Sequence, residues 1–119
     1  MKKSIVKEKS KVFALNVINL YKYLTIDKKE YVISKQLLRS GTSIGANINE
    51  ALCSISRKEY LSKMYVSYKE ASESQYWLEL LRESDYINEY EFDAINGKCE
   101  ELRKILSSIT KTTKENLNS

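Results

Sequence analysis

The sequence contains no histidine and no proline, and it has only 3 glycines and 2 cysteines among its 119 residues. Without histidine, the chain lacks the side chain that most often serves as a general base near neutral pH and as a metal ligand. Proline and glycine interrupt helices, so their scarcity favours long, unbroken helices. We therefore expect a non-enzymatic protein that binds neither a metal nor a cofactor.

Cysteines and long apolar runs are also scarce. Cys53 and Cys99 lie far apart within apolar patterns, so we expect two buried, reduced thiols and not a disulfide or a metal site. No apolar run reaches the roughly 18 residues that a transmembrane helix requires. Lysines interrupt the apolar residues of the N-terminus, which therefore lacks the apolar core of a signal peptide. We expect a cytoplasmic protein with no membrane partner.

Apolar residues recur at spacings of three and four along the chain, which predicts amphipathic helices. No segment alternates with a period of two, so we expect no sheet. Capping-box patterns at Asp27–Glu30 and Ser56–Glu59, and a cap at Asn88, mark the starts of three helices. The predicted helices span about residues 4–25, 28–53, 57–83 and 89–111, and a polar tail at 112–119 is expected to fray. This pattern predicts an all-α, antiparallel up-down-up-down four-helix bundle that forms a single domain, residues 1–119.

The second predicted helix has polar side chains on the same side as its apolar stripe. Buried polar groups need hydrogen-bond partners. We therefore expect a polar seam that joins the second helix to the third, with Arg39 meeting Glu70 or Glu73. A direct ligand-binding role for this stretch is the alternative. The predicted seam comprises Gln36, Arg39, Ser40, Ser43, Asn47, Glu50, Glu70 and Glu73.

The third predicted helix carries more aromatic residues than one buried face requires. Its main stripe is expected to be Leu61, Met64, Tyr68, Ala71, Gln75 and Leu78. Tyr65, Tyr76 and Trp77 lie off this stripe. Aromatic residues are enriched at subunit interfaces, so these three are candidates for one. Simple partial exposure of the rings is the alternative.

Positive charge is concentrated at the N-terminus. Residues 1–30 contain 8 lysines and 3 acids, whereas the whole chain has a net charge of +4. A basic helix permits contact with nucleic acid, although a solvated lysine face is the alternative. The candidate nucleic-acid-binding residues are Lys2, Lys3, Lys7, Lys9, Lys11 and Lys22.

Two runs of sequence resemble a known family. These are QLLRSGTSIGANINEA at residues 36–51 and KEASESQYWLELLRESDYI at residues 69–87. They are similar to bacterial four-helix-bundle proteins associated with intervening sequences in 23S ribosomal RNA genes, and the similarity extends from Phe13 to about Ile109. The resemblance implies a homopentamer. It also implies kinship to the accessory protein of diversity-generating retroelements, a pentamer with a basic surface that works with a reverse transcriptase and nucleic acid.

Three functional hypotheses follow from these observations. The first is a homo-oligomeric bundle that binds RNA or a ribonucleoprotein, which the basic first helix and the resemblance both favour. The second is a protein-protein interaction scaffold with no nucleic-acid role, which the surplus aromatic residues and the acidic third helix favour. The third is a small-molecule site between subunits.

Overall fold

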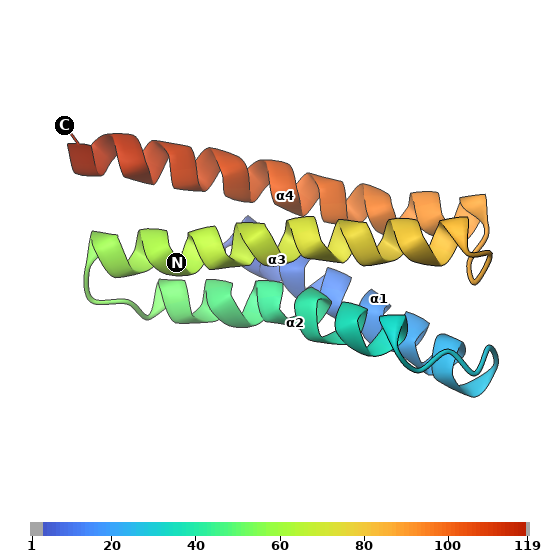
Figure 1. The fold of residues 1–119 in the computed structure, drawn as a ribbon. Coiled ribbons are helices and arrows are strands. Elements are labelled where there is room, and N and C mark those ends of the chain that lie inside the picture. Colours follow the sequence, from blue (N-terminus) through green and yellow to red (C-terminus); the bar gives the residue numbers. More distant parts are fainter. Residues whose placement is uncertain (1–3, 119) are drawn as a thin grey trace.

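Four α-helices make up nearly all of the structure, a computed structural model that describes residues 4–118 (Figure 1). The helices are α1 (Ile5–Ile26), α2 (Ile33–Leu52), α3 (Arg57–Glu83) and α4 (Glu89–Asn118). Consecutive helices run antiparallel through short connections, and the bundle measures 50 × 24 × 21 Å. The predicted all-α four-helix bundle is confirmed, and no strand occurs among the described residues.

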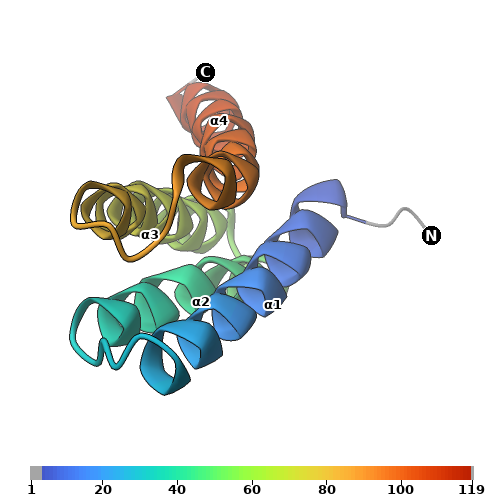
Figure 2. The same cartoon turned by 90° about the vertical axis from the view of Figure 1, so that its right-hand side faces the viewer.

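The helices form a closed square in which each contacts two neighbours. The contacting pairs are α1 with α2, α2 with α3, α3 with α4, and α4 with α1. The α4–α1 side is the most open, because α1 is inclined away from α4 (Figure 2). Two shallow pockets of about 200 and 210 Å³ lie on that side. None of these four helices is long and apolar enough to cross a membrane.

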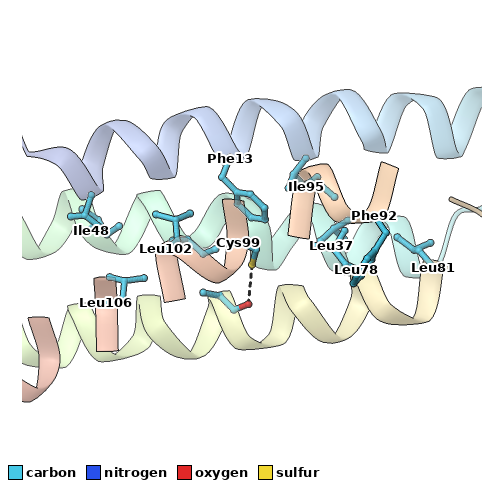
Figure 3. Packing of buried hydrophobic residues seen from close by; sticks show 14 of the residues in the cluster. Phe13, Leu37, Ile48, Leu78, Leu81, Phe92, Ile95, Cys99, Leu102 and Leu106 are labelled. Carbon is cyan, nitrogen blue, oxygen red and sulfur yellow. Dashed lines mark hydrogen bonds between the residues drawn. The ribbon is translucent and has the colours of Figure 1, made fainter. Parts of the chain in front are cut away.

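The apolar core runs through the middle of the bundle, with contributions from all four helices (Figure 3). Phe13, Leu78 and Leu102 are completely buried within it. Cys99 is also completely buried, and its thiol donates to the carbonyl oxygen of Ala71 at 3.3 Å. The expectation of two buried cysteines is wrong for Cys53, which is exposed because it follows the last residue of α2.

The start of α2 differs from the predicted residue 28. After α1, Lys29 adopts a left-handed conformation with φ of 57°, and α2 begins only at Ile33. The cap is the carboxylate of Glu30, which accepts hydrogen bonds from the backbone amides of Val32 (3.1 Å), Ile33 (3.0 Å) and Ser34 (2.7 Å). These amides would otherwise lack partners at the helix start. Glu30 thus acts as the cap and not as the last member of a capping box begun by Asp27.

The other helix ends include one more correction. The hydroxyl of Ser56 accepts from the amide of Glu59 at 3.1 Å, so this capping residue acts as expected at the start of α3. The Asn88 side chain likewise accepts from the amide of Glu91 at 2.8 Å at the start of α4. The predicted frayed tail, however, is helical through Asn118. As a result α4 is 30 residues long and α2 only 20.

Candidate nucleic-acid interface

Lys7 and Lys11 lie one turn apart on the exposed surface of α1. Both line a groove of about 410 Å³ between α1 and α2, and no acidic side chain lines that groove. Its other lining residues are small or polar, among them Ala14, Gly45 and Ala46. The groove therefore presents two cations beside a surface that a phosphate could approach.

Two glycines of α2 allow this close approach of α1. A Cβ atom at Gly41 would lie 2.9 Å from Cγ2 of Val17, and one at Gly45 would lie 3.1 Å from Oγ of Ser10. The first distance is shorter than van der Waals contact, so a side chain at position 41 would force the helices apart. The glycines in the run at residues 36–51 thus serve helix packing, which sets the width of the basic groove.

The remaining candidate lysines do not gather in this groove. Lys9 points to α4, where its Nζ lies 3.1 Å from Oε1 of Glu101 in an ion pair. Lys22 is exposed about 16 Å farther along the helix axis than Lys11, at the usual rise per residue. Lys2 and Lys3 lie outside the described residues. The structure therefore brings together only Lys7 and Lys11 among the candidates that it describes.

A polar seam does cross from α2 to α3, with a buried part and an exposed part. In the buried part, the hydroxyls of Ser40 and Ser74 lie 2.9 Å apart and both residues are completely buried. Ser67 is equally buried and donates to the carbonyl oxygen of Ile44 at 2.8 Å. The expected stripe of α3 is wrong at Tyr68 and Gln75, which are only partly buried, whereas Ser67 and Ser74 are buried. Both serines continue the three-four spacing that starts at Met64.

The exposed part of the seam is an ion-pair cluster around Arg39. Its guanidinium donates to Glu70 at 3.1 Å and also to Glu73, which are the two partners expected for it. The hydrogen bond to Glu73 is the main cause that raises the pKa of Arg39. Glu73 also accepts from the indole nitrogen of Trp77 at 3.0 Å. Because Arg39 is half-exposed, water screens this cluster, which positions side chains more than it stabilises the fold.

The other expected members of the seam have different partners. Ser43 and Asn47 donate to carbonyl oxygens one turn earlier in α2, those of Arg39 and Ser43, and so do not reach α3. Glu50 reaches α3 through an ion pair of 2.9 Å with Lys63. Gln36 is exposed at the surface of α2.

The three aromatic interface candidates have distinct surroundings. Tyr65 and Tyr76 are 52% and 54% exposed, whereas Trp77 is partly buried and held by Glu73. The ring of Tyr65 stacks on that of Tyr68, with centroids 6.1 Å apart. Tyr65 and Tyr76 are thus available for contact, whereas Trp77 is already part of the seam.

Two titratable side chains of α4, Cys99 and Glu100, have strongly shifted pKa values. Burial raises the pKa of the Cys99 thiol to about 12, which suppresses the thiolate form that nucleophilic chemistry needs. Hydrogen bonds from Arg103 and then Gln75 lower the pKa of Glu100 to about 2, so this acid stays ionised near neutral pH. Within residues 4–118, no group of three acids or cysteines is placed to hold a metal ion.

Comparisons with known proteins place the chain in a family. A family profile described as 23S rRNA-intervening sequence protein matches residues 2–108. The crystal structure of a protein of unknown function from the S23 ribosomal protein family of Bacteroides thetaiotaomicron has a TM-score of 0.89 and 50% sequence identity, with 90% of this chain and 99% of that chain covered. No curated protein matches. The chain therefore belongs to the 23S rRNA-intervening sequence protein family.

Proposed function

We propose that this protein is a non-catalytic, cytoplasmic RNA-binding bundle that works as a homo-oligomer, a pentamer by family resemblance. The observation that carries RNA binding is the groove between α1 and α2, where Lys7 and Lys11 lie without an acidic neighbour in the lining. The two neighbouring lysines repel each other, so an anion that binds between them lowers the electrostatic energy of the groove. Phosphate contacts of this kind supply sequence-independent affinity for nucleic acid.

A second observation favours self-association. Ile5, Val12, Leu15 and Ile26 lie on one side of α1, and each is about half or more exposed. Val12 also borders the open α4–α1 side, where it lines a pocket with Lys98 and Glu101. An exposed apolar stripe on a helix marks an interaction surface. A second copy of the chain would cover this stripe in an oligomer.

Electrophoretic mobility shifts with a structured RNA at two salt concentrations test the RNA proposal. The double variant Lys7→Gln/Lys11→Gln should bind more weakly, and each lysine should lower the salt slope by about 1. The matched control is Lys35→Gln/Lys104→Gln, which removes the same charge from exposed positions on α2 and α4. This control should bind nearly as well as the native protein.

Three results would count against the RNA proposal. Absence of binding at low salt would remove RNA as a partner. Equal losses in both double variants would mean that net charge, and not the groove on α1, drives the binding. If a protein partner were instead captured after nuclease treatment, the interaction-scaffold alternative would replace the RNA proposal.

A further inference from the structure

A larger groove lies on the opposite side of the bundle, between the start of α3 and the end of α4. Its volume is about 790 Å³, and its floor includes Tyr65, Tyr68 and Leu61. Lys58 on α3 and Lys111 and Lys114 on α4 stand around it, and no acidic residue lines it. None of these three lysines forms an ion pair with the described part of the chain. Lys114 lies on the part of α4 that continues past the predicted end at residue 111.

The rings on the floor are held in place. Tyr65 and Tyr68 stack with an interplanar angle of 21°, and Tyr65 remains 52% exposed. The Nζ of Lys69 lies over the same ring, 5.8 Å from its centroid, although Lys69 does not itself line the groove. An exposed aromatic ring surrounded by cations fits a ligand that has both a flat apolar face and negative charge.

We propose that this groove binds unpaired nucleotides of an RNA strand, with a base stacked against Tyr65 and adjoining phosphates on Lys58, Lys111 and Lys114. Stacking platforms beside basic grooves bind single strands in this way. The inference rests on the proposed RNA-binding function and assigns it a single-stranded subsite. Paired RNA does not fit, because its bases are stacked on each other and cannot reach a ring inside a groove.

The chemistry of the lining favours a nucleic acid over an acidic helix. A docked helix requires a continuous apolar groove for residues one and two turns apart. Here the hydroxyls of Ser62, Ser107 and Thr110 interrupt the apolar floor. Those hydroxyls can hydrogen-bond with sugar and phosphate oxygens, which a nucleic acid presents at every nucleotide.

Fluorescence anisotropy with a labelled oligouridine tests the proposal on the full chain, with a blunt-ended RNA duplex as the second ligand. Tyr65→Ala should weaken oligouridine binding about tenfold, whereas Tyr65→Phe should retain it because the ring remains. Lys111→Gln/Lys114→Gln should lower the single-strand salt slope by about 1.4. None of these variants should change binding of the duplex appreciably.

Tyr90→Ala is the matched control, because Tyr90 is 84% exposed and lies at the start of α4, away from the groove. It should bind oligouridine like the native protein. Circular dichroism should show unchanged helix content in every variant, so that a loss of affinity reports the groove.

Unchanged oligouridine binding in Tyr65→Ala, with duplex binding intact, would overturn this proposal and leave RNA binding through α1 standing. If the native protein bound neither oligouridine nor paired RNA, the proposed function itself would be refuted. If Tyr65→Ala lowered the mass of the oligomer and left RNA affinity unchanged, the groove would be an interface between copies, which also contradicts the proposal.

Discussion

At the residue scale, the connection between α1 and α2 depends on Glu30. Its side chain is 7% exposed, and burial alone would raise the pKa of its carboxyl group. Hydrogen bonds from the amides of Ile33, Ser34 and Val32 outweigh burial and lower the pKa below its ordinary value. The charged carboxylate is therefore the form that the folded protein prefers.

Glu30→Ala should destabilise the protein by about 1–2 kcal/mol at pH 7, because three amides lose their acceptor. A carboxyl group with a lowered folded pKa stabilises the fold above its unfolded pKa of about 4.3, and this contribution is lost as the pH falls through the folded pKa. The difference between native and variant should therefore shrink in acid. Urea unfolding between pH 7 and pH 3 measures it.

Glu115→Ala is the control for this experiment, since Glu115 is an exposed acid near the end of α4. It should unfold like the native protein at every pH. A Glu30→Ala variant with native stability at pH 7 would show that the carboxylate does not hold the start of α2.

The two cysteines should react at very different rates. Cys99 is completely buried with a pKa of about 12, whereas Cys53 is exposed after α2. Alkylation by iodoacetamide at pH 8 should modify one thiol in the folded protein and both after denaturation. Mass spectrometry of the peptides should identify Cys53 as the first site; rapid modification of Cys99 would contradict its burial.

At the element scale, glycines at different positions have opposite consequences. Gly41 is buried against Val17, a stiff β-branched side chain, whereas nothing lies within 4 Å of a Cβ atom built on Gly97. A methyl group added at position 41 would therefore clash with Val17, whereas one added at position 97 would have no close neighbour. The contrast separates helix packing from helix propensity.

Gly41→Ala should destabilise the bundle by about 1–3 kcal/mol, because the added methyl group overpacks the α1–α2 contact. Gly97→Ala should stabilise it by about 0.5–1 kcal/mol, because alanine loses less backbone entropy in a helix. Thermal unfolding followed by circular dichroism measures both. A stabilised Gly41→Ala variant would mean that α1 can shift outward at little cost.

The sequence predicts the elements better than it predicts their ends and polar contacts. The three-four spacing of apolar residues in α4 predicts a stripe of Phe92, Ile95, Cys99, Leu102, Leu106 and Ile109. The first five are buried, and Ile109 is partly buried. The sequence did not predict the start of α2. The capping-box pattern places Glu30 inside the helix, whereas Glu30 precedes the helix and caps it. The polar pattern of α2 predicts Ser40 in the α2–α3 contact, but not Ser67 and Ser74 on α3, since serine normally favours water-exposed positions.

At the scale of the whole molecule, the exposed stripe on α1 predicts self-association. Light scattering should give a mass well above the 13.9 kDa of one chain. Val12→Lys/Leu15→Lys should lower this mass, because two buried lysines would have to lose their hydration in an interface.

The control for the stripe is Ile55→Lys/Tyr90→Lys, at sites that are 97% and 84% exposed and lie outside α1. This variant should keep the native mass. A native protein that stays monomeric at micromolar concentration would refute the oligomer, and a mass unchanged in the α1 variant would place the interface elsewhere.

The closed square of helices has a consequence for the order in which the chain folds. Three of its four sides join helices that are consecutive in sequence, and only the α4–α1 side joins the two ends of the chain. Bundles dominated by contacts local in sequence fold in microseconds to milliseconds. Contact between α4 and α1 closes the longest loop in the chain, so it costs the most chain entropy of the four contacts. The contact between α4 and α1 should therefore form last, as the step that completes the bundle.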